Sequence, residues 1–347
     1  MLTEKNTVAD MIRSGQTLML SGTEEMLTGL PEGNWVGGTS SYFMNQDGGQ
    51  KCLDKIFVSK LPSDAKLEKV KFYDAEHLAE ISGESPDNGF TYLLMPFESE
   101  AHLKYAEKAP SFPGQFTKIT IGWVAGVLLE ELGKKATKVF NGQNGQSSEV
   151  DALAMHCSLP KDRYATISTI NIYEANTSAT ITFPNNGFEA EDCLINGQPA
   201  NIVEYIKENG IDIKHPLVTH FRFGSRAKKM VDITDHPMFQ DYGGNYVNVS
   251  FAGIHGNKAL LYAPVFKDVK YYFAKPADYL TEFRKNLTAV SDEFAFSFSC
   301  ILNYTNSQLD GKITEGMYGP FTFGEIAYQL LNQTLVYLDI KKLSTTG

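Results

Sequence analysis

Apolar and polar residues alternate along much of the chain, which is the pattern of half-buried β-strands. Residues 151–159 show it clearly, with Leu153 and Met155 on one side and His156 on the other. The same alternation predicts further strands at 165–173, 217–223, 246–251, 294–301 and 333–340. Residues 90–97 form a nearly continuous apolar run, as expected of a strand that is covered on both faces.

Helical spacing occurs at fewer places. It predicts helices at 7–14, 99–109 and 278–287. A further helix is predicted to begin at Pro199, because Ile202, Val203 and Ile206 follow it at helical intervals. The mixture of elements indicates an α+β (mixed α/β) fold that is rich in strands.

Turn residues at 184–187 (Pro-Asn-Asn-Gly) divide the predicted elements into two groups. We therefore expect an N-terminal lobe at 1–186, a C-terminal lobe at 187–341 and a flexible tail at 342–347. Each lobe is expected to be a mixed sheet with flanking helices.

The first forty residues predict a compact β-α-β unit. A strand at 16–21 leads to a helix capped by Thr23, and a strand at 34–36 runs into Gly37-Gly38-Thr39-Ser40-Ser41. Such crossovers place the strands parallel, and ligands favour the carboxyl ends of parallel strands. Thr39 and Ser40 are therefore candidate ligand-binding residues, and a simple turn that leaves the strand is the alternative.

Composition and charge narrow the function classes. Hydrophobic residues make up 42% of the 347 residues and charged residues 21%, as in soluble globular proteins. The formal net charge of −10 argues against nucleic acids and anionic membranes as partners, because both are bound through basic patches. The first residues lack an apolar signal core, and no apolar run could span a bilayer, so we expect a cytoplasmic protein.

Segments at both ends of the predicted C-terminal lobe resemble FIST domains. Residues 192–200 (Asp-Cys-Leu-Ile-Asn-Gly-Gln-Pro-Ala) resemble the strand, Asn-Gly turn and Pro-Ala helix entry that open the C-terminal half of those domains. Phe298-Ser299-Cys300, followed by Gly324-Glu325-Ile326, is similar to the closing signature of that half, and Asn332-Gln333-Thr334 is similar to the strand after it. In the N-terminal lobe, residues 35–40 are similar to a Gly-Gly strand end. Residues 301–304 (Ile-Leu-Asn-Tyr) depart from the family pattern and mark a divergent member.

The resemblance implies a sensory module that binds a small molecule. An amino acid or another small metabolite is the implied ligand, and haem is an implied alternative cofactor because some relatives bind it.

Glu325 is the candidate of greatest interest, because it lies among aromatic residues where carboxylates are rarely left without a partner. Its expected partner is a protein cation or a bound ammonium group, with Asn332 completing a polar pocket. An equal alternative is that Glu325 caps backbone amides at the lobe interface.

Three other residues are candidates for contact with a ligand. Cys300 shares a strand face with Phe296 and Phe298, which favours an inert buried thiol over a reactive one. His220 and Arg222 could together bind a carboxylate, or they belong to a solvated strand face. The seven histidines and four cysteines show no spacing typical of a metal site.

These patterns lead to one main hypothesis, a small-molecule-binding protein of the sensory or signal-transduction type with its pocket between the lobes. A separate signalling protein is then an expected partner, because no output module is apparent in the sequence, and homo-oligomerisation stays open. The alternatives are a cytoplasmic enzyme that uses the same cleft, with Cys300 or His220 taking part, and a haem-binding gas sensor.

Overall fold

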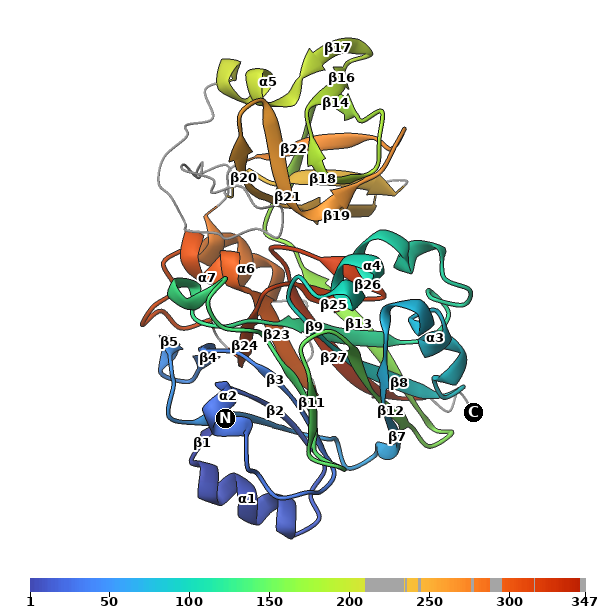
Figure 1. Ribbon diagram of the computed structural model, residues 1–347, viewed down its shortest axis with the longest axis vertical. Helices are drawn as coiled ribbons and strands as arrows, with labels where there is room; N and C mark the ends of the chain where they lie inside the picture. Colours follow the sequence, from blue (N-terminus) through green and yellow to red (C-terminus); the bar gives the residue numbers. More distant parts are fainter. Residues whose placement is uncertain are drawn as a thin grey trace.

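The computed structural model describes residues 1–209, 234, 236–242, 245–275, 278–287, 295–314 and 316–343. Within these residues the chain forms a strand-rich mixture of sheets and short helices (Figure 1). The predicted mixed α and β class is confirmed, and β-structure predominates. Arg222 and His220 lie outside the described residues.

Three six-stranded sheets make up the lower part of the molecule in Figure 1. The first has the order β1 (Leu2–Thr3), β6 (Ile56–Lys60), β2 (Leu18–Gly22), β3 (Trp35–Thr39), β10 (Val139–Asn141) and β11 (Gln146–Ser148). The second has the order β26 (Gln329–Leu331), β25 (Glu325–Ala327), β9 (Thr120–Ala125), β8 (Gly89–Pro96), β12 (Ala152–Ser158) and β7 (Lys66–Tyr73). The third has the order β13 (Arg163–Ile170), β27 (Leu335–Lys342), β23 (Phe296–Cys300), β24 (Gly319–Thr322), β4 (Tyr42–Asn45) and β5 (Gly48–Lys51).

Two further sheets, here called the upper sheets, lie at the top of Figure 1. One has the order β17 (Gln198–Asn201), β16 (Asp192–Ile195), β14 (Glu174–Thr182), β22 (Tyr271–Lys275), β18 (Met238–Tyr242) and β19 (Asn245–Val249). The other has the order β15 (Gly187–Ala190), β21 (Lys258–Val265) and β20 (Phe251–His255).

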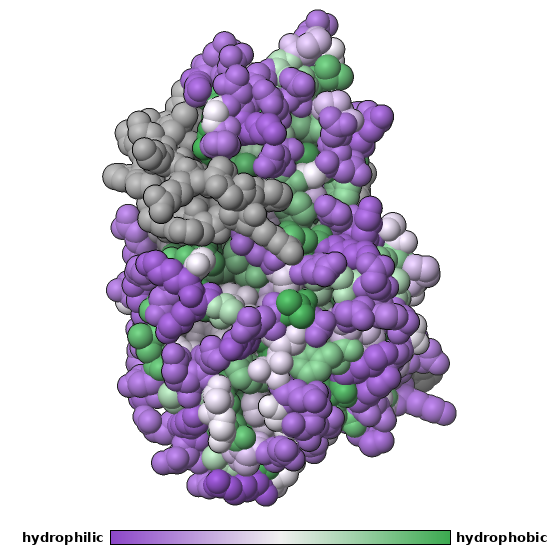
Figure 2. Space-filling model, viewed as in Figure 1, coloured by the Kyte–Doolittle hydropathy of each residue, from purple (hydrophilic) through white to green (hydrophobic). Residues whose placement is uncertain are grey.

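The helices are short and lie on the sheets. They are α1 (Lys5–Arg13), α2 (Glu24–Leu27), α3 (Glu80–Glu84), α4 (Glu100–Lys108), α5 (Ile202–Glu208), α6 (Tyr279–Leu287) and α7 (Ile301–Asn306). Single 3₁₀ turns occur at η1 (Ala75–His77), η2 (Ala109–Ser111) and η3 (Leu129–Glu131). Hydrophilic residues cover most of the face in Figure 2, with apolar residues in small separate areas.

The last five strands return to the lower sheets and pair there with strands from the first half of the chain. β24 pairs with β4, β25 with β9, and β27 with β13. Strands from both sides of the predicted boundary at 186 and 187 therefore share these sheets, and the division into lobes stays a prediction.

Three parallel strand pairs have carboxyl ends that meet. These pairs are β2 with β3, β8 with β9, and β23 with β24. The Gly126 amide, just after β9, donates to the Thr39 carbonyl at 2.8 Å, and the Phe323 amide, just after β24, donates to the Val124 carbonyl at 3.0 Å. The predicted β-α-β unit at the start of the chain is thus confirmed, and its strands supply one of the three pairs of carboxyl ends that lie together.

One predicted boundary is wrong. Pro199 lies in strand β17, and helix α5 begins three residues later, where the Asn201 side chain caps the amides of Val203 and Glu204. The Asn196-Gly197 turn closes a β16–β17 hairpin, with both residues at positive φ. Pairing across that turn carries the strand past Pro199.

Candidate functional site

A narrow cavity lies beside the carboxyl ends of β8, β9, β23 and β24. Its walls are mostly apolar, formed by Phe97, Leu129, Leu132, Tyr262, Ile301, Leu302 and Phe323. Its polar lining residues are Cys300, Thr305 and Asn332. The cavity has a volume of about 30 Å³, which is room for about two water molecules. Only a small group of atoms enters without movement of the walls.

The aromatic wall depends on a glycine. Phe97 and Phe323 contact each other edge to face, with ring centroids 5.2 Å apart. A Cβ atom at Gly126 would lie 2.4 Å from the Phe323 ring, so only glycine leaves room for this ring beside the end of β9. The close approach of strand ends therefore creates the wall.

Cys300 lies at the floor of the cavity, where strand β23 becomes helix α7. It is the last residue of β23 and the N-cap of α7, which places its thiol between strand and helix. Burial and the neighbouring Glu325 raise the pKa of the thiol well above its ordinary value. The thiol is therefore protonated at neutral pH, as expected of an inert buried cysteine.

Glu325 is fully buried next to Cys300, and its partners are donors. Its Oε1 accepts a hydrogen bond from the Thr322 hydroxyl at 3.1 Å. Its Oε2 accepts from the Thr334 hydroxyl at 2.9 Å and the Thr334 amide at 3.3 Å. The Cys300 thiol is a further hydrogen-bond partner. Among the residues that the structure describes, the hydrogen-bond partners of the Glu325 carboxyl are therefore these hydroxyl, amide and thiol groups and not a cation. This agrees with the alternative interpretation, in which Glu325 caps backbone amides.

Burial also decides the charge of Glu325. Desolvation raises its pKa to about 8, although the hydrogen bonds from Thr334, Thr322 and Cys300 act in the opposite direction. The carboxyl is therefore mostly neutral at pH 7. The protonated Cys300 thiol that lines the cavity and the Glu325 carboxyl next to it are therefore both mostly uncharged at pH 7.

Asn332 is the polar lining residue that stands out. Its side chain is only 2% exposed, and its Oδ1 has no hydrogen-bond partner within the described part of the chain. Buried polar atoms of this kind are rare and call for an explanation. Because Asn332 lines the cavity, a ligand that pairs with its amide is one explanation.

Gln333, the next residue, joins the lower sheets to the upper sheets and was missed by sequence reasoning. Its Nε2 donates to the Tyr173 hydroxyl at 3.0 Å and to the Thr234 carbonyl at 2.5 Å. Its Oε1 accepts from the Ser250 hydroxyl at 2.5 Å, and its carbonyl accepts from the Asn248 amide group at 3.3 Å. We call these four hydrogen bonds the Gln333 clamp. The Asn-Gln-Thr motif indicated Asn332 and Thr334 as candidates but gave no sign of this role for Gln333.

Thr39 and Ser40 hold strand ends together and do not join the residues at Cys300. The Thr39 hydroxyl accepts from the Lys138 amide at 3.0 Å, and the Ser40 hydroxyl donates to the Phe321 carbonyl at 2.9 Å. Thr39 lines a different cavity, of about 200 Å³, with Glu24, Glu131 and Lys135. Of the predicted residues that are described, the structure thus brings Glu325, Cys300 and Asn332 together. Phe97 and Tyr262 were not predicted, because the pattern along the chain does not reveal which distant strands meet.

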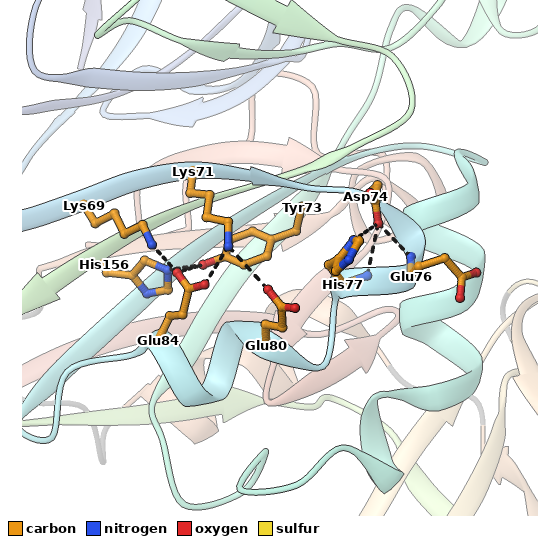
Figure 3. A network of polar contacts seen from close by, with 9 residues as sticks. All are labelled: Lys69, Lys71, Tyr73, Asp74, Glu76, His77, Glu80, Glu84 and His156. Carbon is orange, nitrogen blue, oxygen red and sulfur yellow. Dashed lines mark hydrogen bonds and ion pairs between the residues drawn. The ribbon is translucent and has the colours of Figure 1, made fainter.

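A second polar cluster is centred on His156 (Figure 3). His156 is buried, contrary to its predicted place on a polar strand face, and its Nε2 lies 2.9 Å from the Tyr73 hydroxyl. The Tyr73 hydroxyl donates its single proton to Glu84 at 2.9 Å, so it must accept from the Nε2–H of His156. The Nδ1 atom of His156 then accepts from the Thr91 hydroxyl at 2.8 Å. Burial lowers the pKa of His156 to about 4, which keeps it neutral.

Glu84 fixes the outer end of this cluster. Burial opposes its ionisation, but hydrogen bonds from Lys69, Lys71 and Tyr73 outweigh that effect and lower its pKa to about 2. The contacts join α3 to strands β7 and β12. Because every group has a partner, the cluster is a structural network.

Tyr73→Phe tests this structural role. The change should lower the free energy of unfolding by about 1–2 kcal/mol, because it leaves the buried His156 Nε2–H without an acceptor. Urea denaturation at pH 7 measures the loss. Tyr164→Phe, at an exposed position on β13, is the matched control and should change stability by less than about 0.5 kcal/mol. Equal effects of the two substitutions would contradict the role.

Comparison with known families and proteins gives one match. A family model described as "Family of unknown function (DUF6976)" matches residues 3–225 and 225–341. No curated protein and no solved structure matches the chain. Among the described helices, none combines the length and apolar character needed to cross a membrane.

Proposed function

The chain belongs to DUF6976, a family of unknown function, and from the geometry of its cavity we propose that it is a small-molecule-binding protein of the sensory type. The ligand enters the cavity at Cys300 and Asn332. The observation that carries the proposal is the buried Asn332 Oδ1, which lacks a partner among the described residues, in a residue that lines a mostly apolar cavity. The resemblance to FIST domains points in the same direction.

The position of the cavity supports the proposal. Ligands of sheets with parallel strands bind outside the carboxyl ends of those strands, and the cavity lies where two such pairs end. Its lining also includes Phe97 from the predicted N-terminal lobe and Tyr262 from the predicted C-terminal lobe. Pockets favour such junctions.

Binding is better supported than catalysis. A cysteine nucleophile acts as a thiolate, whereas burial raises the pKa of Cys300. Glu325 has its oxygens occupied by Thr322 and Thr334. A haem needs far more room than the cavity volume of about 30 Å³. A sensory role adds a separate signalling protein as the receiver of the output.

Native mass spectrometry of the purified full chain tests the proposal. The wild type should carry a co-purified small molecule, and Thr305→Phe should lose it, because the new ring fills the cavity from α7. Ser307→Phe adds the same ring at the end of α7, outside the lining residues, and should keep the ligand. Circular dichroism checks that both variants fold. Absence of bound mass in the wild type, or its retention by Thr305→Phe, would count against the cavity.

A further inference from the structure

We propose that the ligand of this cavity is a small uncharged molecule, mostly apolar, whose buried end carries one polar group that hydrogen-bonds the side-chain amide of Asn332. This inference rests on the proposed function and deepens it by naming the class of ligand. It departs from the expectation of an amino acid held through its ammonium group.

The lining of the cavity selects for an apolar ligand with a single polar contact. Seven of the lining residues are large and apolar, and none of those that the structure describes carries a charge. Of the polar three, Thr305 donates its hydroxyl to the Leu302 carbonyl at 3.2 Å, and the Cys300 thiol pairs with Glu325. Asn332 is left as the lining residue whose buried polar atom has no partner in the described chain.

The uncharged lining disfavours a charged ligand. Transfer of an isolated ion into an apolar site is very costly unless an opposite charge meets it. Cys300 lines the cavity and Glu325 is its buried neighbour, and burial raises the pKa of both groups, which leaves the thiol protonated and the carboxyl mostly neutral at pH 7. The Glu325 oxygens, in addition, already accept bonds from Thr322 and Thr334. Neither an ammonium nor a carboxylate therefore meets a charged side chain among the described residues that line the cavity.

The chemistry of an amide fits this ligand class. A carboxamide offers a carbonyl acceptor and two N–H donors, so it pairs with a hydroxyl, a carbonyl or another amide. With its polar group paired to Asn332, the ligand can place a short alkyl part against Phe97, Leu302 and Phe323, and anything larger requires these walls to move apart. Burial of that part supplies most of the affinity.

Four probes of similar size and shape that differ in charge test the effect of charge alone. We would measure binding of isobutanol, isobutyramide, isobutylammonium and isobutyrate to the full chain by titration calorimetry at pH 7. Isobutanol and isobutyramide should bind at least about tenfold more tightly than the two ions, because only the ions carry a charge into the cavity. Tighter binding of isobutylammonium or isobutyrate would overturn the inference.

Asn332→Leu separates a ligand contact from a structural role. Replacement of a buried polar group that lacks a partner by an apolar one should leave the melting temperature of the ligand-free protein equal or higher. The same change should weaken isobutanol and isobutyramide by about tenfold, which is the cost of a lost buried hydrogen bond. A lower melting temperature with unchanged affinity would show that Asn332 only supports the fold.

Asn303→Leu is the matched control. Asn303 is also buried on α7 with an Oδ1 that lacks a partner among the described residues, but it does not line the cavity, and its Nδ2 donates to Ser299 and Thr334. This variant should lose stability and keep its affinity for the neutral probes. If none of the four probes binds while Thr305→Phe still removes a co-purified ligand, this inference fails and the proposed function stands. If no ligand co-purifies and no probe binds, both fail.

Discussion

The free energy of unfolding of Glu325→Gln should rise relative to that of the wild-type protein as the pH increases from about 5 to 8, because the substitution removes the loss of stability that Glu325 contributes over this range. In the folded protein, burial raises the pKa of Glu325 from 4.5 to about 8. The folded state therefore keeps its proton over a range in which the unfolded chain has already lost it. Since the unfolded state binds fewer protons there, the free energy of unfolding falls as the pH rises.

The size of this effect follows from the shift. The stabilisation from the neutral carboxyl is fully present below about pH 4.5 and is lost by about pH 8, at about 1.4 kcal/mol per pH unit, which amounts to roughly 4–5 kcal/mol. Glutamine stays neutral and should lack this loss. Urea denaturation of both proteins at several pH values from 5 to 9 measures the difference between the two profiles.

Other titrating groups cancel in that comparison. Burial lowers the pKa of His102 and His156 to about 4, so both proteins should gain stability as the pH rises from about 4 to 6.5. Glu189→Gln, which only removes a surface ion pair with Lys258, is the control and should follow the wild-type profile. Parallel profiles for the wild type and Glu325→Gln would refute the argument that Glu325 is buried in a neutral form.

Gly38→Ala should be strongly destabilising, because the new Cβ would lie 2.6 Å from the buried ring of Trp123. Neither the ring nor strand β3 can move freely, since both lie within sheets. We expect a loss of about 1–3 kcal/mol or more, as for overpacked cores. Urea denaturation at pH 7 measures it.

A second substitution shows whether the clash is the cause. In a Trp123→Phe background the smaller ring leaves space, so Gly38→Ala should cost at least about 1 kcal/mol less than in the wild type. Gly83→Ala is the control, because nothing lies within 4 Å of its Cβ position in helix α3, and it should stabilise the protein by about 0.5–1 kcal/mol. A small cost of Gly38→Ala in the wild type would mean that the Gly-Gly pair serves another purpose than ring packing.

The fold class and most elements could be predicted from local patterns. The apolar run at 90–97 lies almost entirely in β8 and is buried there, and the helix predicted at 99–109 is α4, with Ser99 as its N-cap. Pairing between distant strands could not be predicted, because β24 and β4 lie far apart in sequence. At Pro199 two local signals competed, and the hairpin at Asn196-Gly197 prevailed over the helical spacing.

The candidate site was only partly predictable, because local patterns identify single residues but not the distant residues that surround them. Glu325 stood out because a charge among aromatic residues needs partners, and the structure supplies them from Thr322 and Thr334. The hydroxyls of Thr39 and Ser40 carried no comparable signal to separate a ligand contact from a link between strands. The walls at Phe97 and Tyr262 depend on tertiary packing, which alternation along one strand does not encode.

The clamp at Gln333 has a consequence for communication through the molecule. Asn332 and Gln333 share a peptide bond, yet one lines the cavity and the other is bonded to Tyr173, Thr234 and Ser250. A ligand that repositioned Asn332 would therefore act directly on the hydrogen bonds of Gln333 to these residues. Under the proposed sensory function, this single backbone step between Asn332 and Gln333 would be the shortest route from an occupied cavity to the upper sheets.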